Sequence, residues 1–519
     1  MMRYFNIAGP CSSAKHYMID AATRLQGVEE LIGREQYFVI HAARQSGKTT
    51  YLQDLSKKLN AGGKYYALYC SLESAQGVID PKEGIPAIIS CLKDSFSDTD
   101  IPQGNKFAQA ADLTDYISVL KAELSRFCKL SDKPLVILFD EADCLSEGTL
   151  ISFLRQLRNG YNSRSLSPFV HSVALVGMRN IRDYKAKIRP DSETLGSASP
   201  FNIVTESFTL KNFTKEEIVQ LYRQHTDETV QVFEEDAIEL VWEQTQGQPW
   251  LVNAIAREVI EKILHSDYAK PVTAELVKEA IQSIILNRPT HIDSLLERLK
   301  EDRVRKIIEP MILGEEFIPR DSDDFLYTRD LGLIRVVNSV VEPANPIYAE
   351  VIIRKLSSDM QEALRNPKYP YQLPRYLKDG CIDMDFLMRD FQKFWQLNSA
   401  MWVNMSDYKE AAPHLVMMAF LQRVVNGGGQ VIREMASGKG RLDLCLIYEN
   451  QKYPIELKIR YGNRYIEKGL EQTARYMDLH CCNEGWMVVF DRRKTVKWED
   501  KLYFKKETVD GKTVTVVGA

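Results

Sequence analysis

A run of nine residues near the N-terminus has the types and spacing that could bind a phosphate group. The run AARQSGKTT, residues 42–50, directly follows the apolar run YFVIH and directly precedes a stretch with helical character. Gly47 lets several backbone N–H groups point at one anion, because it has no side chain to obstruct their approach. Lys48 can place its ammonium on the terminal phosphates, and the Thr49 hydroxyl suits Mg²⁺. This is a Walker A pattern, GxxxxGK[ST], in which Ala42 replaces the first glycine.

A pair of acidic residues follows a second apolar run. Five apolar residues at 135–139 precede Asp140 and Glu141, which is typical of a buried parallel strand that ends in acid. Asp140 could hold the water shell of Mg²⁺, and Glu141 could accept a proton from an attacking water. A core strand followed by an acidic capping loop is the alternative, but the pairing with residues 42–50 favours bound ATP and Mg²⁺. The expected nucleotide contacts are Ala42, Arg44, Gln45, Ser46, Gly47, Lys48, Thr49, Thr50 and Asp140, with Thr49 and Asp140 as metal ligands and Glu141 as catalytic base.

Hydrolysis needs a further polar group near the γ-phosphate. The apolar run 172–177 is followed by Arg179 and Asn180, either of which could fill that role, and a solvated turn is the equal alternative. The sequence does not single out an arginine that acts between subunits, and it leaves homo-oligomerisation open.

The pattern of apolar residues predicts four folded parts and a linker. Short β-branched runs alternate with helices up to about residue 210, which indicates an α/β class fold. Helices then dominate: Thr214 and Glu217 form a capping box, and an apolar stripe follows Pro249. The predicted ranges are an ATPase core at 1–210, a helical lid at 211–290, a winged helix at 291–365, a proline-rich linker at 366–375 and a second α/β domain at 376–519.

These motifs resemble the bacterial AAA+-like, STAND-related P-loop ATPases over residues 1 to about 360. The resemblance rests on AARQSGKTT, LVILFDEAD, the lid run GQPWLVNAIAREV, and the pair DLGLI and NPIYAEVI of the winged helix. It implies a parallel-sheet NTPase with a lid and a winged helix. It also implies that an N-terminal segment lies on the adenine, with Ala8 and Gly9 or Tyr17 close to the base. The winged helix could bind DNA, but a packing role is favoured because no helix there is notably basic.

Two carboxylates and a lysine converge in the predicted C-terminal domain. Glu456 and Lys458 share one face of a strand, because alternate residues of a strand point the same way. Asp443 begins the preceding strand and approaches the same spot if the intervening residues form a hairpin. A divalent metal would relieve the repulsion between the carboxylates of Asp443 and Glu456, bind a phosphate oxygen and activate water. An ordinary amphipathic strand is the plainer interpretation of Glu456 and Lys458.

The order of elements here resembles the PD-(D/E)XK nuclease superfamily, in its QxxxY-bearing branch, over residues 400–495. In that resemblance Asp443, Glu456 and Lys458 are the catalytic core, with metal at the two carboxylates. Gln472 and Tyr476, four residues apart on one helix, contact substrate or brace the site. A further acid would come from Glu410, with Glu434 as its rival.

Composition limits the class of protein. The chain has 519 residues, 45% of them hydrophobic and 27% charged, and a net charge of −4, so it is neither a disordered chain nor a polycation. Residues 401–519 carry 19 Lys and Arg against 15 Asp and Glu, a local basic excess that a solvated surface explains equally well. No apolar run approaches the length of a membrane span or a secretory signal. The nine scattered cysteines suit reduced thiols, and we expect a cytoplasmic protein without a membrane partner.

Together these features predict an ATP-binding and ATP-hydrolysing protein coupled to a Mg²⁺-dependent nuclease. Nucleic acid is the expected partner, with DNA favoured over RNA, and a role in defence or DNA processing rests on the resemblance alone. One alternative is a STAND-like regulatory scaffold whose C-terminal domain binds nucleic acid or protein without cutting it. Another is an ATPase that acts on protein partners.

Overall fold

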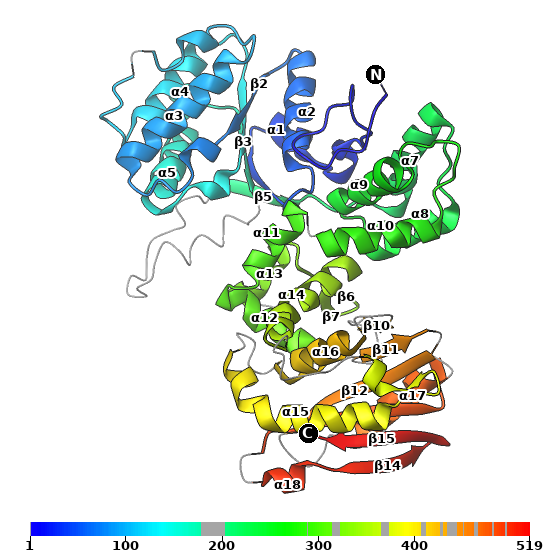
Figure 1. Ribbon diagram of the computed structural model, residues 1–519. Helices are drawn as coiled ribbons and strands as arrows, with labels where there is room; N and C mark the ends of the chain where they lie inside the picture. Colours follow the sequence, from blue (N-terminus) through cyan, green and yellow to red (C-terminus); the bar gives the residue numbers. More distant parts are fainter. Residues whose placement is uncertain are drawn as a thin grey trace. The chain divides into compact units, whose positions relative to one another are not determined.

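The computed structural model describes most of the chain (Figure 1). The described residues are 2–109, 111–177, 203–287, 289–313, 322–364, 373–405, 412–425, 429–432, 444–449, 451–460, 466–479, 482–493 and 496–519. The chain divides into two compact units. Unit 1 comprises Met1–Asn287 with Arg329–Gly332, and unit 2 comprises Arg288–Thr328 with Leu333–Ala519. No described helix is both long and apolar enough to cross a membrane.

Unit 1 is built on a five-stranded parallel sheet in the order β2-β3-β4-β1-β5. The strands are β1 (Tyr37–His41), β2 (Tyr66–Ser71), β3 (Leu135–Asp140), β4 (Ser172–Gly177) and β5 (Val204–Thr209). The strands predicted at 37–41, 135–139 and 172–177 are therefore confirmed. All parallel pairs bring their carboxyl ends to one edge, so residues 42–50 and Asp140 lie at the same edge of the sheet.

Two hydrophobic clusters cover the two faces of this sheet. Tyr37 and Val39 of β1 face one cluster with helices α3 (Pro81–Ser97), α4 (Val119–Leu130) and α5 (Glu147–Ser163). Phe38 and Ile40 face the other, with α1 (Val28–Gly33) and α2 (Lys48–Ala61). Because both faces of the central strands are buried, their sequences are continuous apolar runs rather than alternating ones.

The helical part of unit 1 comprises α7 (Lys215–Thr229), α8 (Glu235–Thr245), α9 (Pro249–Arg257) and α10 (Ala274–Asn287). Both halves of the predicted capping box are present: Thr214 accepts the backbone N–H of Glu217, and the Glu217 carboxylate accepts that of Thr214. After α9 the chain continues as a π-helical turn, Glu258–Ile263. We refer to α7–α10 as the lid, after the helical lid predicted at 211–290, and that assignment stays a prediction.

Unit 2 begins with short helices and a small hairpin. Helices α11 (Thr290–Arg298), α12 (Asp302–Leu313) and α13 (Asp323–Asp330) precede the antiparallel strands β6 (Ile334–Val337) and β7 (Val340–Pro343), which are followed by α14 (Pro346–Leu364). Helix α13 ends within Arg329–Gly332, the segment that belongs to unit 1. The hairpin turns at Asn338 and Ser339, both with positive φ. These are the elements expected of a winged helix, and that assignment stays a prediction.

The rest of unit 2 contains a six-stranded mixed sheet in the order β10-β11-β12-β13-β15-β14. Its strands are β10 (Gly429–Ile432), β11 (Leu444–Tyr448), β12 (Gln451–Arg460), β13 (Glu484–Asp491), β14 (Phe504–Val509) and β15 (Lys512–Gly518), and a small pair, β8 (Leu377–Lys378) and β9 (Cys381–Ile382), precedes them. Helices α15 (Met384–Met405) and α16 (Ala412–Val425) pack on the face that carries Phe490. Helix α17 (Ile466–Leu479) covers the opposite face, where Gly469 lies against Met487 and Lys458. A short helix, α18 (Trp498–Lys501), precedes β14.

Candidate nucleotide-binding site

The phosphate loop joins the end of β1 to the start of α2. Gly47 adopts a φ of 95°, a left-handed conformation that an L side chain rarely takes, so the glycine of the motif is needed by the backbone. Ala42 has no positive φ, is buried, and donates its backbone N–H to the carbonyl oxygen of Gly177. A methyl group is therefore accommodated where the usual pattern has its first glycine.

Lys48 is the first residue of α2 and is folded back onto the loop. Its ammonium donates to the carbonyl oxygens of Ala42 at 2.8 Å and Ala43 at 2.9 Å. Burial lowers the pKa of Lys48, and the carboxylates of Glu141 and Asp143 oppose that shift. The ammonium is thus held inside the loop by two carbonyl oxygens, which negatively charged phosphate oxygens could replace as partners.

The other predicted loop residues differ in their exposure to solvent. Ser46 is buried and its hydroxyl donates to the carbonyl oxygen of Ala43 at 2.8 Å. Arg44 and Gln45 are exposed. The Thr50 hydroxyl accepts the backbone N–H of Cys11 at 2.9 Å, which ties an N-terminal segment to α2.

Asp140 accepts three hydrogen bonds at the carboxyl end of β3. Thr49 donates its hydroxyl proton to Oδ2 at 2.7 Å, the Tyr69 hydroxyl donates to the same oxygen at 3.1 Å, and the backbone N–H of Glu141 reaches Oδ1 at 3.0 Å. The residue is 1% exposed. The two halves of the motif, Thr49 and Asp140, are therefore in direct contact.

The Thr49–Asp140 pair suits Mg²⁺ by the chemistry of its oxygens. The Thr49 hydroxyl uses its single proton on Asp140, so both of its lone pairs are left for a metal. A carboxylate has about four lone-pair positions, of which Asp140 uses three. Mg²⁺ usually takes one or two protein oxygens together with water and substrate phosphates. The finding that no three His, Cys, Asp or Glu side chains of the described residues form a metal cage is compatible with such a site.

Glu141 follows Asp140 in a left-handed conformation, with a φ of 55°. Burial raises the pKa of its carboxyl, and so do the neighbouring Asp143 and Asp140, while Lys48 opposes the shift. A carboxyl with a raised pKa is a better proton acceptor than an ordinary one, which fits a general base. Arg179 and Asn180, the predicted γ-phosphate sensors, lie outside the described residues.

Two residues of this site, Arg24 and Tyr69, were not predicted. Arg24 ends the short helix Ala21–Arg24 and donates through Nη2 to the carbonyl oxygen of Ser46 at 3.0 Å and through Nε to that of Lys211 at 2.8 Å. Tyr69 lies in β2, next to β3 in the sheet. Neither belongs to a recognisable motif, and their roles depend on which strands and turns become neighbours.

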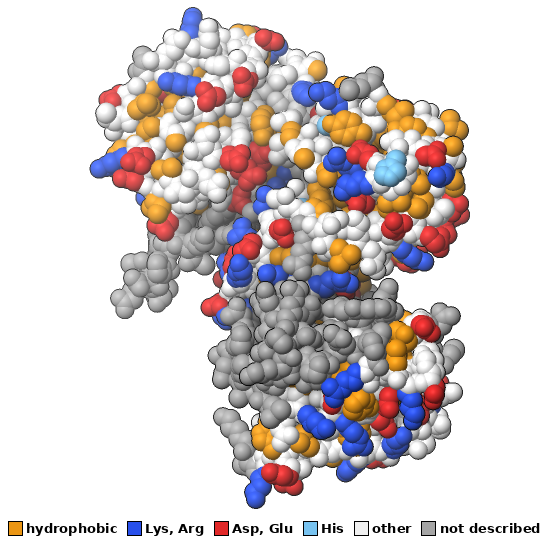
Figure 2. Space-filling model, viewed as in Figure 1, with side chains coloured by type: hydrophobic (Ala, Val, Ile, Leu, Met, Phe, Trp, Pro, Cys, Tyr) orange, Lys and Arg blue, Asp and Glu red, His pale blue; other side chains and the backbone are white. Residues whose placement is uncertain are grey.

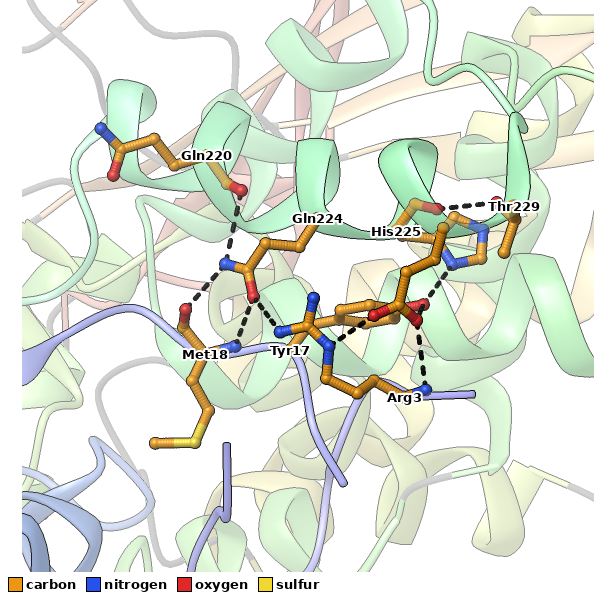
Figure 3. A network of polar contacts seen from close by, with 8 residues as sticks. Arg3, Tyr17, Met18, Gln220, Gln224, His225 and Thr229 are labelled. Carbon is orange, nitrogen blue, oxygen red and sulfur yellow. Dashed lines mark hydrogen bonds and ion pairs between the residues drawn. The ribbon is translucent and has the colours of Figure 1, made fainter. Parts of the chain in front are cut away.

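An N-terminal segment, residues 3–18, connects the phosphate-loop helix to the lid. Arg3 forms an ion pair with Glu228 at 2.6 Å and donates to Gln224 at 3.1 Å (Figure 3). Gln224 also exchanges hydrogen bonds with the backbone of Met18 (Figure 3). Trp250 of α9 donates to the carbonyl oxygen of Ile7. With the contact between Cys11 and Thr50, the segment bridges α2, α7 and α9.

Part of this segment, residues 6–18, was expected to lie on an adenine. Tyr17 is only 2% exposed, packs against Phe5 and His225, and donates its hydroxyl to Glu228 at 3.2 Å. Its ring therefore serves the contact with the lid and offers no open face for a base. Ala8 and Gly9 are exposed, and their predicted position beside the base stays a prediction.

In unit 2, β11 and β12 form the predicted hairpin, with Leu444 opposite Ile455. Glu456 and Lys458 share a face of β12, and their Oε1 and Nζ atoms lie 2.6 Å apart. Leu457 points the other way and is buried. Asp443, Glu410 and Glu434 lie outside the described residues, so their convergence with Glu456 stays a prediction.

Helix α17 brings Gln472 and Tyr476 to the same side of this sheet as Lys458. The Oε1 atom of Gln472 is buried and accepts no hydrogen bond from the described residues. Tyr476 is 3% exposed and packs against Cys445 and Ile447 of β11. A position so deeply buried is better suited to bracing the sheet than to touching a substrate.

The basic excess of the C-terminal sequence is partly neutralised in the structure. Arg493 pairs with Asp491 at 2.6 Å, and Lys512 pairs with Asp478 at 2.7 Å. Figure 2 shows Lys and Arg side chains interspersed with acidic ones over this part of the molecule. On this face the described surface is mixed in charge rather than uniformly basic.

Comparison with known proteins supports the ATPase part of the chain. Residues 111–353 match the family model described as an AAA-like domain. The match begins after the phosphate loop and includes Asp140 and Glu141. No curated protein sequence matches the chain.

Among solved structures, the chain is similar to the Walker-type ATPase of Pyrococcus abyssi, with 16% identity and a TM-score of 0.46 over 67% of this chain and 99% of that one. It is also similar to Cdc6p from Pyrobaculum aerophilum, with 14% identity and a TM-score of 0.36 over 66% and 94%. The RuvB Holliday junction branch migration motor of Thermotoga maritima has 11% identity and a TM-score of 0.33 over 64% and 92%. All three TM-scores lie below 0.5, and nothing about this chain's activity follows from them.

Proposed function

We propose that unit 1 binds ATP with Mg²⁺ and hydrolyses it. The observation that carries the proposal is the 2.7 Å contact between Thr49 and Asp140, formed beside a left-handed Gly47 and a buried Lys48. Gly47, Lys48 and Thr49 follow β1, and Asp140 ends the parallel strand β3 at the same edge of the sheet. Together they supply backbone N–H groups for phosphate, one ammonium, and two oxygen ligands for a metal. Such an arrangement serves phosphoryl transfer and has little use in a purely structural loop.

The chain's own residues would divide the work as follows. The backbone N–H groups around Gly47 hold the phosphates, and Lys48 exchanges its two carbonyl partners for phosphate oxygens. Thr49 and Asp140 hold Mg²⁺, which when bound neutralises the charge that develops on the transferred phosphate. Glu141 accepts the proton of the attacking water at its carboxylate.

Exchange of Glu141 for Gln tests this assignment. The variant should bind ATP as tightly as the wild type but lose about 10²-fold in turnover, which is the lower end of what a general base contributes. Glu147→Gln is the matched control, because Glu147 is exposed at the start of α5. Phosphate release under excess MgCl₂ measures both. Turnover of Glu141→Gln equal to that of the control would overturn the role of Glu141.

We propose further that the C-terminal domain is a Mg²⁺-dependent nuclease of the PD-(D/E)XK type, controlled by the ATPase and acting on nucleic acid, with DNA preferred. Support comes from the contact between Glu456 and Lys458 on β12 and from the order of the sheet, in which β12 pairs antiparallel with β11 and parallel with β13. The predicted metal ligands are Asp443 and Glu456, and Gln472 and Tyr476, both on α17, would contact substrate or brace the site.

Cleavage of DNA by the full chain in MnCl₂ or MgCl₂ tests this second proposal. Lys458→Arg keeps a cation beside the buried Glu456 but moves the charge, so cleavage should fall while the fold is kept. Lys452→Ala changes an exposed lysine of the same strand and should leave cleavage unchanged. Equal cleavage by both variants would contradict the assignment of Lys458.

A regulatory scaffold that binds without cutting is the second candidate, favoured by the mixed charge of the C-terminal surface. The ion pairs of Arg493 with Asp491 and of Lys512 with Asp478 reduce the number of cations available for a phosphate backbone. In that case neither Mg²⁺ nor Mn²⁺ would support cleavage of any nucleic acid, while ATP would still change the oligomeric state of the protein.

A further inference from the structure

The hydroxyl of Tyr69 reaches the carboxylate of Asp140 from a neighbouring strand. Tyr69 lies opposite Leu138 in the pairing of β2 with β3, two residues before Asp140. Its ring is half-buried against the cluster that includes Phe38 and Leu138, and its hydroxyl donates to Oδ2 of Asp140 at 3.1 Å. The ring is thus anchored by packing while its polar end meets the candidate metal site.

The three hydrogen-bond donors to Asp140, which are Thr49, Tyr69 and the backbone N–H of Glu141, belong to different parts of the structure. The backbone N–H of Glu141 belongs to the next residue and has little freedom to orient the carboxylate. Thr49 belongs to the phosphate loop, and its oxygen is itself a candidate metal ligand. Tyr69 belongs to β2 rather than to the phosphate loop, so its hydrogen bond orients Asp140 from within the sheet.

We propose that Tyr69 is a positioning residue for Mg²⁺, which fixes the Asp140 carboxylate in the orientation that the metal and its water shell require. The inference rests on the proposed binding of Mg²⁺ and ATP in unit 1. Residues that hydrogen-bond to a metal ligand orient it, and their loss typically costs about 10- to 100-fold in metal affinity.

The electrostatics of the site keep this tyrosine in its donating form. Burial raises the pKa of the Tyr69 phenol far above its ordinary value, and the charge of Asp140 and the hydrogen bond to it raise it further. The phenol is therefore protonated at neutral pH and can donate to Asp140.

Exchange of Tyr69 for Phe removes the hydroxyl and leaves the packed ring. Tyr66→Phe is the matched control: Tyr66 belongs to the same strand and its hydroxyl also donates to an aspartate, Asp132, at 3.0 Å. That aspartate precedes β3, whereas Asp140 ends it, so the control removes a like hydrogen bond at the opposite edge of the sheet.

The experiment titrates each full-length variant with a fluorescent ATP analogue, first in EDTA and then at rising MgCl₂. Tyr69→Phe should bind the analogue in EDTA as the wild type does and should need about tenfold more MgCl₂ for half of the Mg²⁺-dependent gain in affinity. Tyr66→Phe should follow the wild type in both parts. Thermal melting of the three proteins checks that each is folded.

The outcomes separate this inference from the function on which it rests. A wild type whose binding does not respond to MgCl₂ would overturn the proposed Mg²⁺ site itself. A wild type that responds, with a Tyr69→Phe titration that overlays it, would overturn the role of Tyr69 alone. An equal shift in Tyr66→Phe, or a loss of affinity already in EDTA, would show that the hydroxyl supports the sheet or the loop, and would also contradict a positioning role.

Discussion

The guanidinium of Arg24 donates to the carbonyl oxygen of Ser46 across 3.0 Å, within the phosphate loop. The same side chain donates to the carbonyl oxygen of Lys211, just before the lid, and lies 4.9 Å from the centre of the Phe213 ring. Burial lowers the pKa of Arg24 to about 10, so it still carries its charge at neutral pH. One residue therefore connects the loop that would hold phosphate with the segment that leads into the lid.

Arg24→Ala should destabilise unit 1 and weaken nucleotide binding. The carbonyl oxygens of Ser46 and Lys211 lose the Arg24 donor, and the net contribution of such a hydrogen bond is about 1 kcal/mol. Arg34→Ala is the control, because Arg34 is exposed and forms an i,i+4 pair with Glu30 that is worth at most a few tenths of a kcal/mol. Urea unfolding and titration with an ATP analogue measure the two effects. Identical behaviour of the two variants would refute the connection.

Gly247 marks the point where the chain enters α9. Its φ is 71°, and a Cβ there would lie 1.9 Å from the carbonyl oxygen of Phe213. Gly247→Ala should therefore cost about 1 kcal/mol for the left-handed backbone and at least as much again for the clash. Gly63→Ala separates the two terms, since Gly63 has the same φ of 71° with nothing within 4 Å. If chemical denaturation gives equal losses for both, the clash is not what constrains Gly247.

His16 should make the N-terminal segment sensitive to acid. Its Nδ1 accepts the backbone N–H of Ser12 at 2.9 Å, which requires the neutral ring. Burial lowers its pKa below the ordinary value of 6.5, with a smaller contribution from Lys15. The unfolded chain therefore binds a proton before the folded chain does, and stability is lost as the pH falls below about 6.5.

His16→Asn provides the comparison, because the Asn side-chain oxygen can accept the same N–H and does not titrate. Hydrogen exchange of residues 3–18 at pH 7.5 and 5.5 should show a larger loss of protection in the wild type than in the variant. Equal losses would assign the effect to other groups.

The contact between Glu456 and Lys458 predicts a non-additive pair of substitutions. Lys458→Met would leave the Glu456 carboxylate, which is 2% exposed, without its ammonium at 2.6 Å, and should destabilise the C-terminal domain by about 3 kcal/mol. Adding Glu456→Gln removes the buried charge and should restore part of that loss. Urea midpoints of the two single variants and the double variant test this. A double variant whose loss equals the sum of the single losses would contradict the coupling.

The fold of unit 1 was largely predictable because its signals are local. The runs at 37–41 and 135–139 are continuous and apolar since both faces of a central parallel strand are covered. The capping box of Thr214 and Glu217 and the glycine turn at Gly47 are short patterns with one geometric solution each. The hairpin that aligns Glu456 likewise follows from strand alternation.

The residues that escaped prediction act across long separations in the sequence. Tyr69 and Asp140 are 71 residues apart and meet because β2 pairs with β3, which no local pattern specifies. Arg24 reaches Ser46 only through the path of the chain around α1. The order of the strands in the sheet and the path of the chain thus determine which polar side chains lie at the site.

Every role proposed for unit 1 depends on Lys48 and its loop binding the phosphates of ATP. Titration of the full-length protein with a fluorescent ATP analogue in MgCl₂ tests it most directly, on the wild type, on Lys48→Ala and on Lys58→Ala, an exposed lysine of the same helix that pairs with Glu29. We predict saturable binding by the wild type and by Lys58→Ala, and at least tenfold weaker binding by Lys48→Ala, because a charge-assisted contact is lost. Absence of saturable binding by the wild type, or unchanged affinity in Lys48→Ala, would overturn the proposed phosphate site.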